Sequence, residues 1–126
     1  MIEHILSLPI SFDVLVVDDG SPDGTAEVVK TFQQKHANIH LIEGNGKLGL
    51  GTAYITGFNW WIQHDFEFIF EMDANFSHNP ADLIRLYDAC KTGGADMSVG
   101  SRYITGGKLV NWPWDRKILS YGASLY

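Results

Sequence analysis

Three groups of residues in this chain have types and spacings that could do chemistry. Asp18 and Asp19 end one apolar run, Asp73 ends another, and residues 44–49 between them read GNGKLG. Paired acids that end an early strand can hold Mg²⁺, as in phosphorylation receiver modules. The glycine segment satisfies the pattern G-x-G-x-x-G of dinucleotide sites, in which Asp73 would contact a ribose. The residues alone leave both hypotheses open.

The alternation of apolar runs predicts the elements that would position these side chains. Continuous apolar runs of four to seven residues indicate buried strands, and apolar residues at helical spacing indicate helices. Strands that alternate with helices indicate an α/β fold with a parallel sheet, whose ligand groups lie at the carboxyl ends of the strands. The expected strands are 12–17, 39–42, 66–72 and 95–99; the expected helices are 2–8, 25–36, 52–64 and 80–92.

Length and composition limit the possible classes. The chain has 126 residues, which suits one domain over 1–126. The net charge of −6 argues against a nucleic-acid partner, because such proteins present a basic surface. The single cysteine, Cys90, cannot form an internal disulfide, so we expect a reducing, cytoplasmic compartment. No apolar stretch approaches the ~20 residues of a membrane span, and we expect no signal peptide, because residues 1–4 lack a basic flank and a small-residue cleavage site.

Four segments account for all of these features together. They read VVDDGSPDGTA at 16–26, GKLGLGTAYITGF at 46–58, EMDANFSHNP at 71–80 and GSRY at 100–103. In this order and spacing the chain resembles the polyprenol-phosphate mannosyltransferases, which are family 2 glycosyltransferases. The resemblance implies a GT-A fold, a mostly parallel sheet with helices on both faces. It also implies transfer of mannose from GDP-mannose to a polyprenyl (dolichyl) phosphate, with inversion.

The resemblance implies a donor site at the strand ends. Asp19 and Val17 would contact the guanine base, and Asp18 would support the turn. The cofactor would be Mg²⁺ or Mn²⁺, since oxygen side chains suit a hard cation. Asn75 stands where the family usually has a second aspartate, so the site has one formal negative charge fewer. The implied donor-binding residues are Val17, Asp19, Asp73, Ala74, Asn75, Ser77 and Arg102, and the implied metal ligands are Asp73, Asn75 and Ser77.

The resemblance also implies an acceptor site. Arg102, Arg116 and Ser120 would grip the lipid phosphate, and Arg102 would act in catalysis with Asp73. Guanidinium groups suit this task because they stay charged and bind phosphate through a fork of donors. The lipid acceptor implies peripheral contact with the cytoplasmic face of a membrane. Trp112 and Trp114 could meet that interface or pack in the core.

Two alternatives remain beside mannose transfer from GDP-mannose. A related transferase could use another sugar nucleotide such as UDP-glucose, or the chain could bind a nucleotide without catalysis. Compared with the family, the first strand and the C-terminal part are expected to be absent. Because the first strand is central in a GT-A sheet, we expect a gap between neighbours that it would separate.

Overall fold

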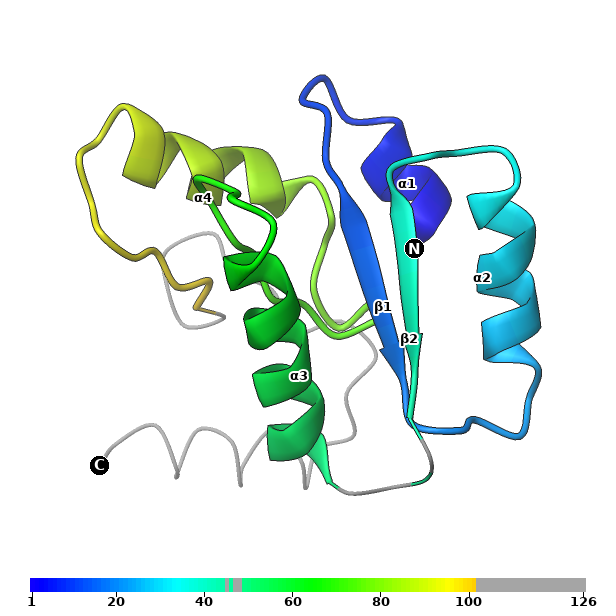
Figure 1. Ribbon diagram of the computed structural model, residues 1–126. Helices are drawn as coiled ribbons and strands as arrows, with labels where there is room; N and C mark the ends of the chain where they lie inside the picture. Colours follow the sequence, from blue (N-terminus) through cyan, green and yellow to red (C-terminus); the bar gives the residue numbers. More distant parts are fainter. Residues whose placement is uncertain (45, 47–48, 102–126) are drawn as a thin grey trace, which may run out of the picture. The chain divides into compact units, whose positions relative to one another are not determined.

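The structure is a computed structural model, and it describes residues 1–44, 46 and 49–101. The chain divides into two compact units, residues 1–87 and residues 88–126. All the elements described below lie in the first unit, except that the last helix runs on into the second. They are, in chain order, α1 (Ile2–Leu6), β1 (Val14–Asp18), α2 (Thr25–Gln33), β2 (Ile39–Glu43), α3 (Leu50–Ile62) and α4 (Asp82–Lys91) (Figure 1).

The two strands form a parallel pair, as the alternation of strand and helix predicted. Their register runs from Val14 opposite Ile39 to Asp18 opposite Glu43. Backbone hydrogen bonds continue the pairing at both ends. Val14 donates to the carbonyl of Asn38 at 2.8 Å, and Gly44 donates to the carbonyl of Asp18 at 2.8 Å. Since β1 leads through α2 to β2, the three elements form a βαβ unit.

Helices α2 and α3 lie on opposite sides of this strand pair (Figure 1). On the α2 side, Val29 is buried, and so is Ile39 at 2% exposure. Lys30 of α2 also forms ion pairs with Glu27 at 3.0 Å and with Glu43 of β2 at 3.1 Å. On the other side, α3 approaches β1 where Gly57 faces Val17. The α/β class is therefore confirmed.

Two of the predicted strands, 66–72 and 95–99, are wrong. In the described part of the chain the sheet consists of β1 and β2 alone. Apolar patterning favours a strand, but a strand forms only where a neighbour offers a ladder of backbone hydrogen bonds. Residues 66–72 are held instead by ring contacts. At 95–99 the apolar side chains of Met97 and Val99 are 77% and 74% exposed, so burial does not favour a strand there.

A groove of about 320 Å³ lies between β1 and the segment 66–70. Residues 10–15 line it on one side and residues 66–70 on the other, and Leu83 and Tyr87 of α4 also contribute. The apolar residues of β1 are half-buried, although their pattern is typical of a strand covered on both faces. Whether this groove is the gap expected from an absent strand stays a prediction.

The helix boundaries follow local signals. Asn79 accepts a hydrogen bond from the backbone of Ala81 at 3.1 Å, which confirms it as the predicted cap before α4. The expected cap of α2, Thr25, is instead its first residue, and the N-cap is Gly24 with φ of 81°. Among the helices of the described residues, none is long and apolar enough to cross a membrane.

Candidate functional site

The loops that follow β1 and β2 meet at one edge of the strand pair. A side-chain carbon added at Gly44 would lie 2.7 Å from Oδ1 of Asp19, closer than real contacts allow. Gly20 has φ of 79° and faces the same loop, with Gly46 Cα 4.0 Å from the position of an added Cβ. Glycine at 44 therefore lets the two loops approach, and the Asp19 carboxylate lies at their contact.

Asp18 has a structural role in this edge. Its side chain is only 5% exposed, and its carboxylate accepts the backbone N–H of Ser21 at 3.2 Å and 3.4 Å. A buried carboxylate is expensive unless it is hydrogen-bonded, so this bond explains how the charge is accommodated. The prediction that Asp18 supports the turn is confirmed. The half-buried Asp19 is then the acid of the pair that can meet a ligand.

The predicted cation ligands lie in one tight turn after residue 72. Ser77 donates from its hydroxyl to Oδ2 of Asp73 at 3.5 Å and from its backbone N–H to Oδ1 of Asn75 at 2.9 Å. Phe76 has φ of 58°, which turns the chain sharply between them. Ala74 is exposed in the same turn.

This donor set fits a hard divalent cation, because a carboxylate, an amide oxygen and a hydroxyl are all oxygen ligands. Within residues 1–44, 46 and 49–101, no three His, Cys, Asp or Glu side chains gather into a metal cluster. A cation at this turn would therefore rely on Asn75 and Ser77 together with Asp73. The hydrogen bond between Ser77 and Asp73 places two of these oxygens within reach of one ion.

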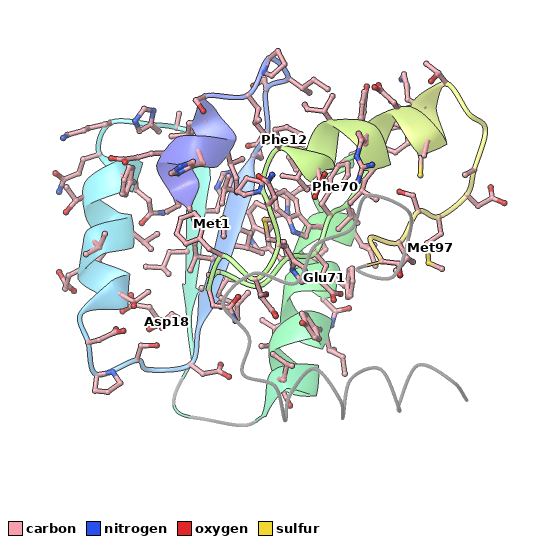
Figure 2. All side chains as sticks on the ribbon, turned by 180° about the vertical axis from the view of Figure 1, so that it is seen from behind. Met1, Phe12, Asp18, Phe70, Glu71 and Met97 are labelled. Atoms are coloured by element: carbon pink, nitrogen blue, oxygen red, sulfur yellow. The ribbon has the colours of Figure 1, made fainter. Side chains whose placement is uncertain are left out.

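Tyr54 of α3 is a residue of this region that the sequence did not single out. Burial raises the pKa of its hydroxyl above 10.0, and the negative charges of Glu71 and Asp73 and a hydrogen bond with Glu71 raise it further. The phenol therefore lies within electrostatic range of both acids. Figure 2 shows Glu71 beside α3. Only the segment GTAY at 51–54 could have drawn attention to it, as part of the glycine-rich motif.

Helix α3 connects the two halves of the candidate site. At Gly57 an added Cβ would lie 3.7 Å from Cγ2 of Val17, so the helix packs closely on β1 just before Asp18 and Asp19. One turn earlier, Tyr54 lies within electrostatic range of Glu71 and Asp73, whose charges raise the pKa of its hydroxyl. Helix α3 is thus packed on the end of β1, and its Tyr54 senses the charges just before the turn 73–77. The groove described above reaches the start of β1 at Val14 and Leu15, and Met72, between Glu71 and Asp73, also lines it.

The predicted acceptor residues lie outside the described part of the chain. These acceptor residues are Arg102, Arg116 and Ser120. Lys47 of the glycine segment, Trp112 and Trp114 also lie outside the described residues. Their roles stay predictions. The structure thus describes the proposed donor residues Val17, Asp19, Asp73, Ala74, Asn75 and Ser77.

Comparison with known proteins gives a family and several relatives. The family model Glycosyl transferase family 2 matches residues 1–125. Over 114 residues the chain is 47% identical to an undecaprenyl-phosphate mannosyltransferase of Micrococcus luteus, covering 90% of the chain and 46% of the relative. It is 45% identical to a polyprenol monophosphomannose synthase of Mycolicibacterium smegmatis, with 90% and 43% covered. A dolichol-phosphate mannosyltransferase of Pyrococcus furiosus is 37% identical, with 90% and 31% covered.

The chain therefore spans less than half the length of each of these relatives. No solved structure matches the chain.

Proposed function

The chain belongs to glycosyl transferase family 2, and we propose that it transfers mannose from GDP-mannose to a polyprenyl phosphate. The observation that carries this proposal is the 47% identity over 90% of the chain to an undecaprenyl-phosphate mannosyltransferase. Membership of the family implies the GT-A fold, with which the parallel β1–α2–β2 unit agrees. The acids at the end of β1 and in the turn 73–77 support a donor site of this kind.

In this proposal Asp19 and Val17 bind the guanine base. A carboxylate can accept two N–H groups of a guanine edge at once, which distinguishes guanine from other bases. Because Asp18 is engaged with Ser21, its neighbour Asp19 is the side chain left for this contact. Gly44 supports this proposal, because the lack of a side chain at 44 leaves room for the Asp19 carboxylate.

Asp73, Asn75 and Ser77 would hold Mg²⁺ or Mn²⁺ beside the diphosphate. When bound, the cation would supply charge neutralisation for the departing GDP. Asp73 supplies the one negative charge among these three ligands. We therefore expect a weaker metal affinity than a site with two aspartates would have.

Arg102, Arg116 and Ser120 would bind the phosphate of the acceptor lipid, with Arg102 also near the donor phosphates. A phosphate monoester is largely dianionic near pH 7, since its second pKa is about 6, so its oxygen can attack the anomeric carbon without a general base. A bond from this oxygen to the anomeric carbon forms as the bond to GDP breaks, which inverts the configuration. Catalysis then consists of in-line positioning and charge neutralisation. A lipid acceptor places the protein at a membrane surface, which we propose to be the cytoplasmic face.

Calorimetric titration of the 126-residue chain with GDP-mannose, with and without Mn²⁺, tests the donor site. We expect Mn²⁺-dependent binding that UDP-glucose does not reproduce, and incorporation of labelled mannose into a polyprenyl phosphate. Tighter binding of UDP-glucose would favour the alternative transferase. Binding without any transfer would favour a nucleotide-binding chain without catalysis.

A matched pair of variants makes the test specific to the turn. Asp73→Ala should weaken Mn²⁺-dependent GDP-mannose binding by roughly ten-fold or more, because it removes the charged ligand. Asp82→Ala is the control, since this exposed acid pairs with Arg85 on α4 at 3.1 Å. Equal affinities in the two variants would place the cation elsewhere.

A further inference from the structure

The backbone of β1 is paired on one side only. In a strand, the N–H and C=O groups of successive residues face alternate sides. Val14 donates to the carbonyl of Asn38. Asp18 accepts from the N–H of Gly44, so the even-numbered residues of β1 face β2. Leu15 therefore directs both of its backbone groups to the opposite side, where they make no hydrogen bond to any described residue.

The outer edge of β2 is different, because α2 and the residues after it reach this edge. The N–H of Ile39 donates to the carbonyl of His36 at 3.2 Å. Its carbonyl accepts from the side chain of Gln33 on α2 at 3.3 Å. Unpaired strand edges are templates for further pairing. The edge at Leu15 is therefore open to another strand, whereas the edge at Ile39 is already in use.

A groove follows the open edge of β1. Figure 1 shows the segment between α3 and α4 on the side of β1 away from β2. Leu15 lines the groove of about 320 Å³ on one side and residues 66–70 line it on the other, and most of the lining is apolar. Phe12 and Phe70 meet across it at 5.7 Å between ring centroids. An occupant must part these two rings, and side-chain movements of this kind are common at interfaces.

The charges that line this groove have one sign. Its two charged residues are Asp13 and Glu67. Asp13 also pairs with His40 at 3.0 Å, whereas Glu67 is exposed. Complementary charge selects between partners, so a cation on the occupant is favoured beside these acids and an anion is disfavoured.

We infer that the open edge of β1 binds an extended strand of a partner polypeptide, with apolar side chains and a lysine or arginine beside Asp13 and Glu67. Main-chain hydrogen bonds to Leu15 supply affinity in this mode of binding, and the groove supplies selectivity. The apolar run of β1 is typical of a strand covered on both faces, yet its residues are half-buried, which supports an occupant of this kind. The inference goes beyond the proposed function, because it involves neither a sugar nucleotide nor a cation.

A short peptide tests this edge in the whole chain. The probe is acetyl-Lys-Val-Ile-Val-Thr-amide, and amide hydrogen exchange is followed by nuclear magnetic resonance. At roughly ten times the dissociation constant, we expect exchange of Leu15 to slow by roughly ten-fold. Leu41, whose backbone faces outward on β2, should keep its rate. Absence of protection at Leu15 in millimolar peptide would overturn the proposal.

A matched peptide separates strand pairing from apolar binding. N-methyl groups on its Ile and two Val residues keep the side chains but remove three backbone donors. We expect this peptide to bind roughly ten-fold more weakly or less, since several hydrogen bonds are lost. Equal binding of the two peptides would identify a pocket for apolar molecules and contradict the strand.

Charge and concentration complete the test. Replacing the Lys of the peptide by Glu should weaken binding several-fold, because Asp13 and Glu67 repel an anion. Equal affinities would show that these acids select nothing. If Leu15 gains protection without peptide as the chain concentration rises, a second copy fills the groove, and the inference of a separate partner is wrong. These outcomes do not depend on GDP-mannose binding, so they are distinguishable from a failure of the proposed function.

Discussion

The two sides of β1 show what a strand pattern requires in order to become a strand. On one side β1 pairs with β2, and Ile39 is 2% exposed. On the other side residues 66–72 also carry an apolar strand pattern, but they form no ladder, and Ile69 is 38% exposed. The two sides differ in whether β1 has an adjacent strand to pair with. Backbone pairing fixes the first side, and side-chain contacts across a groove hold the second.

A pair of isoleucine variants tests most directly whether the two sides of β1 are packed differently. We expect Ile39→Ala to lower the free energy of unfolding by about 2–5 kcal/mol, because it leaves a cavity in a closed core. Ile69→Ala should cost about 1 kcal/mol or less, because its side chain is already partly in water. Urea unfolding followed by circular dichroism measures both. Equal losses would mean that the two sides are equally packed.

Asp18 and Asp73 allow the same comparison of stability to be made after β1 and after residues 66–72. Asp18→Ala should destabilise the fold by about 1–3 kcal/mol, because the Ser21 N–H loses a charged acceptor. Asp73→Ala should change stability by about 0.5 kcal/mol or less, since its described bond to Ser77 is long at 3.5 Å. The same urea titrations distinguish them. A large loss of stability from Asp73→Ala would assign that acid a structural role.

The smallest expected effect is a pH dependence on the α2 side. Hydrogen bonds from the Thr25 hydroxyl at 2.6 Å and from its backbone N–H at 3.0 Å hold the pKa of Asp23 below 3.8. A depressed folded-state pKa adds stability above pH 3.8, which is lost as the pH falls through the folded-state value. Asp23→Asn should therefore flatten the fall in melting temperature between about pH 5 and about pH 2. An unchanged slope would contradict this assignment.

The β1–α2–β2 side was predicted well from the sequence, because the residue patterns that determine it are local. Each signal determines the structure of residues close to it in the chain. Examples are the apolar run before Asp18, the glycines near 44 and the Asn79 cap, and the elements lie close to their expected places. The prediction of a strand at 66–72 was wrong, because backbone pairing depends on whether an adjacent strand is present. Tyr54 was missed because the acids that affect it, Glu71 and Asp73, are 17 and 19 residues further along the chain.

The missing side chain at Gly44 has a consequence for the neighbouring loop after β1. The Asp19 carboxylate occupies the space that any larger residue at 44 would need. The direction of the Asp19 side chain and the residue type at position 44 are therefore linked. Any larger residue at 44 would therefore require the Asp19 side chain to turn away from this edge.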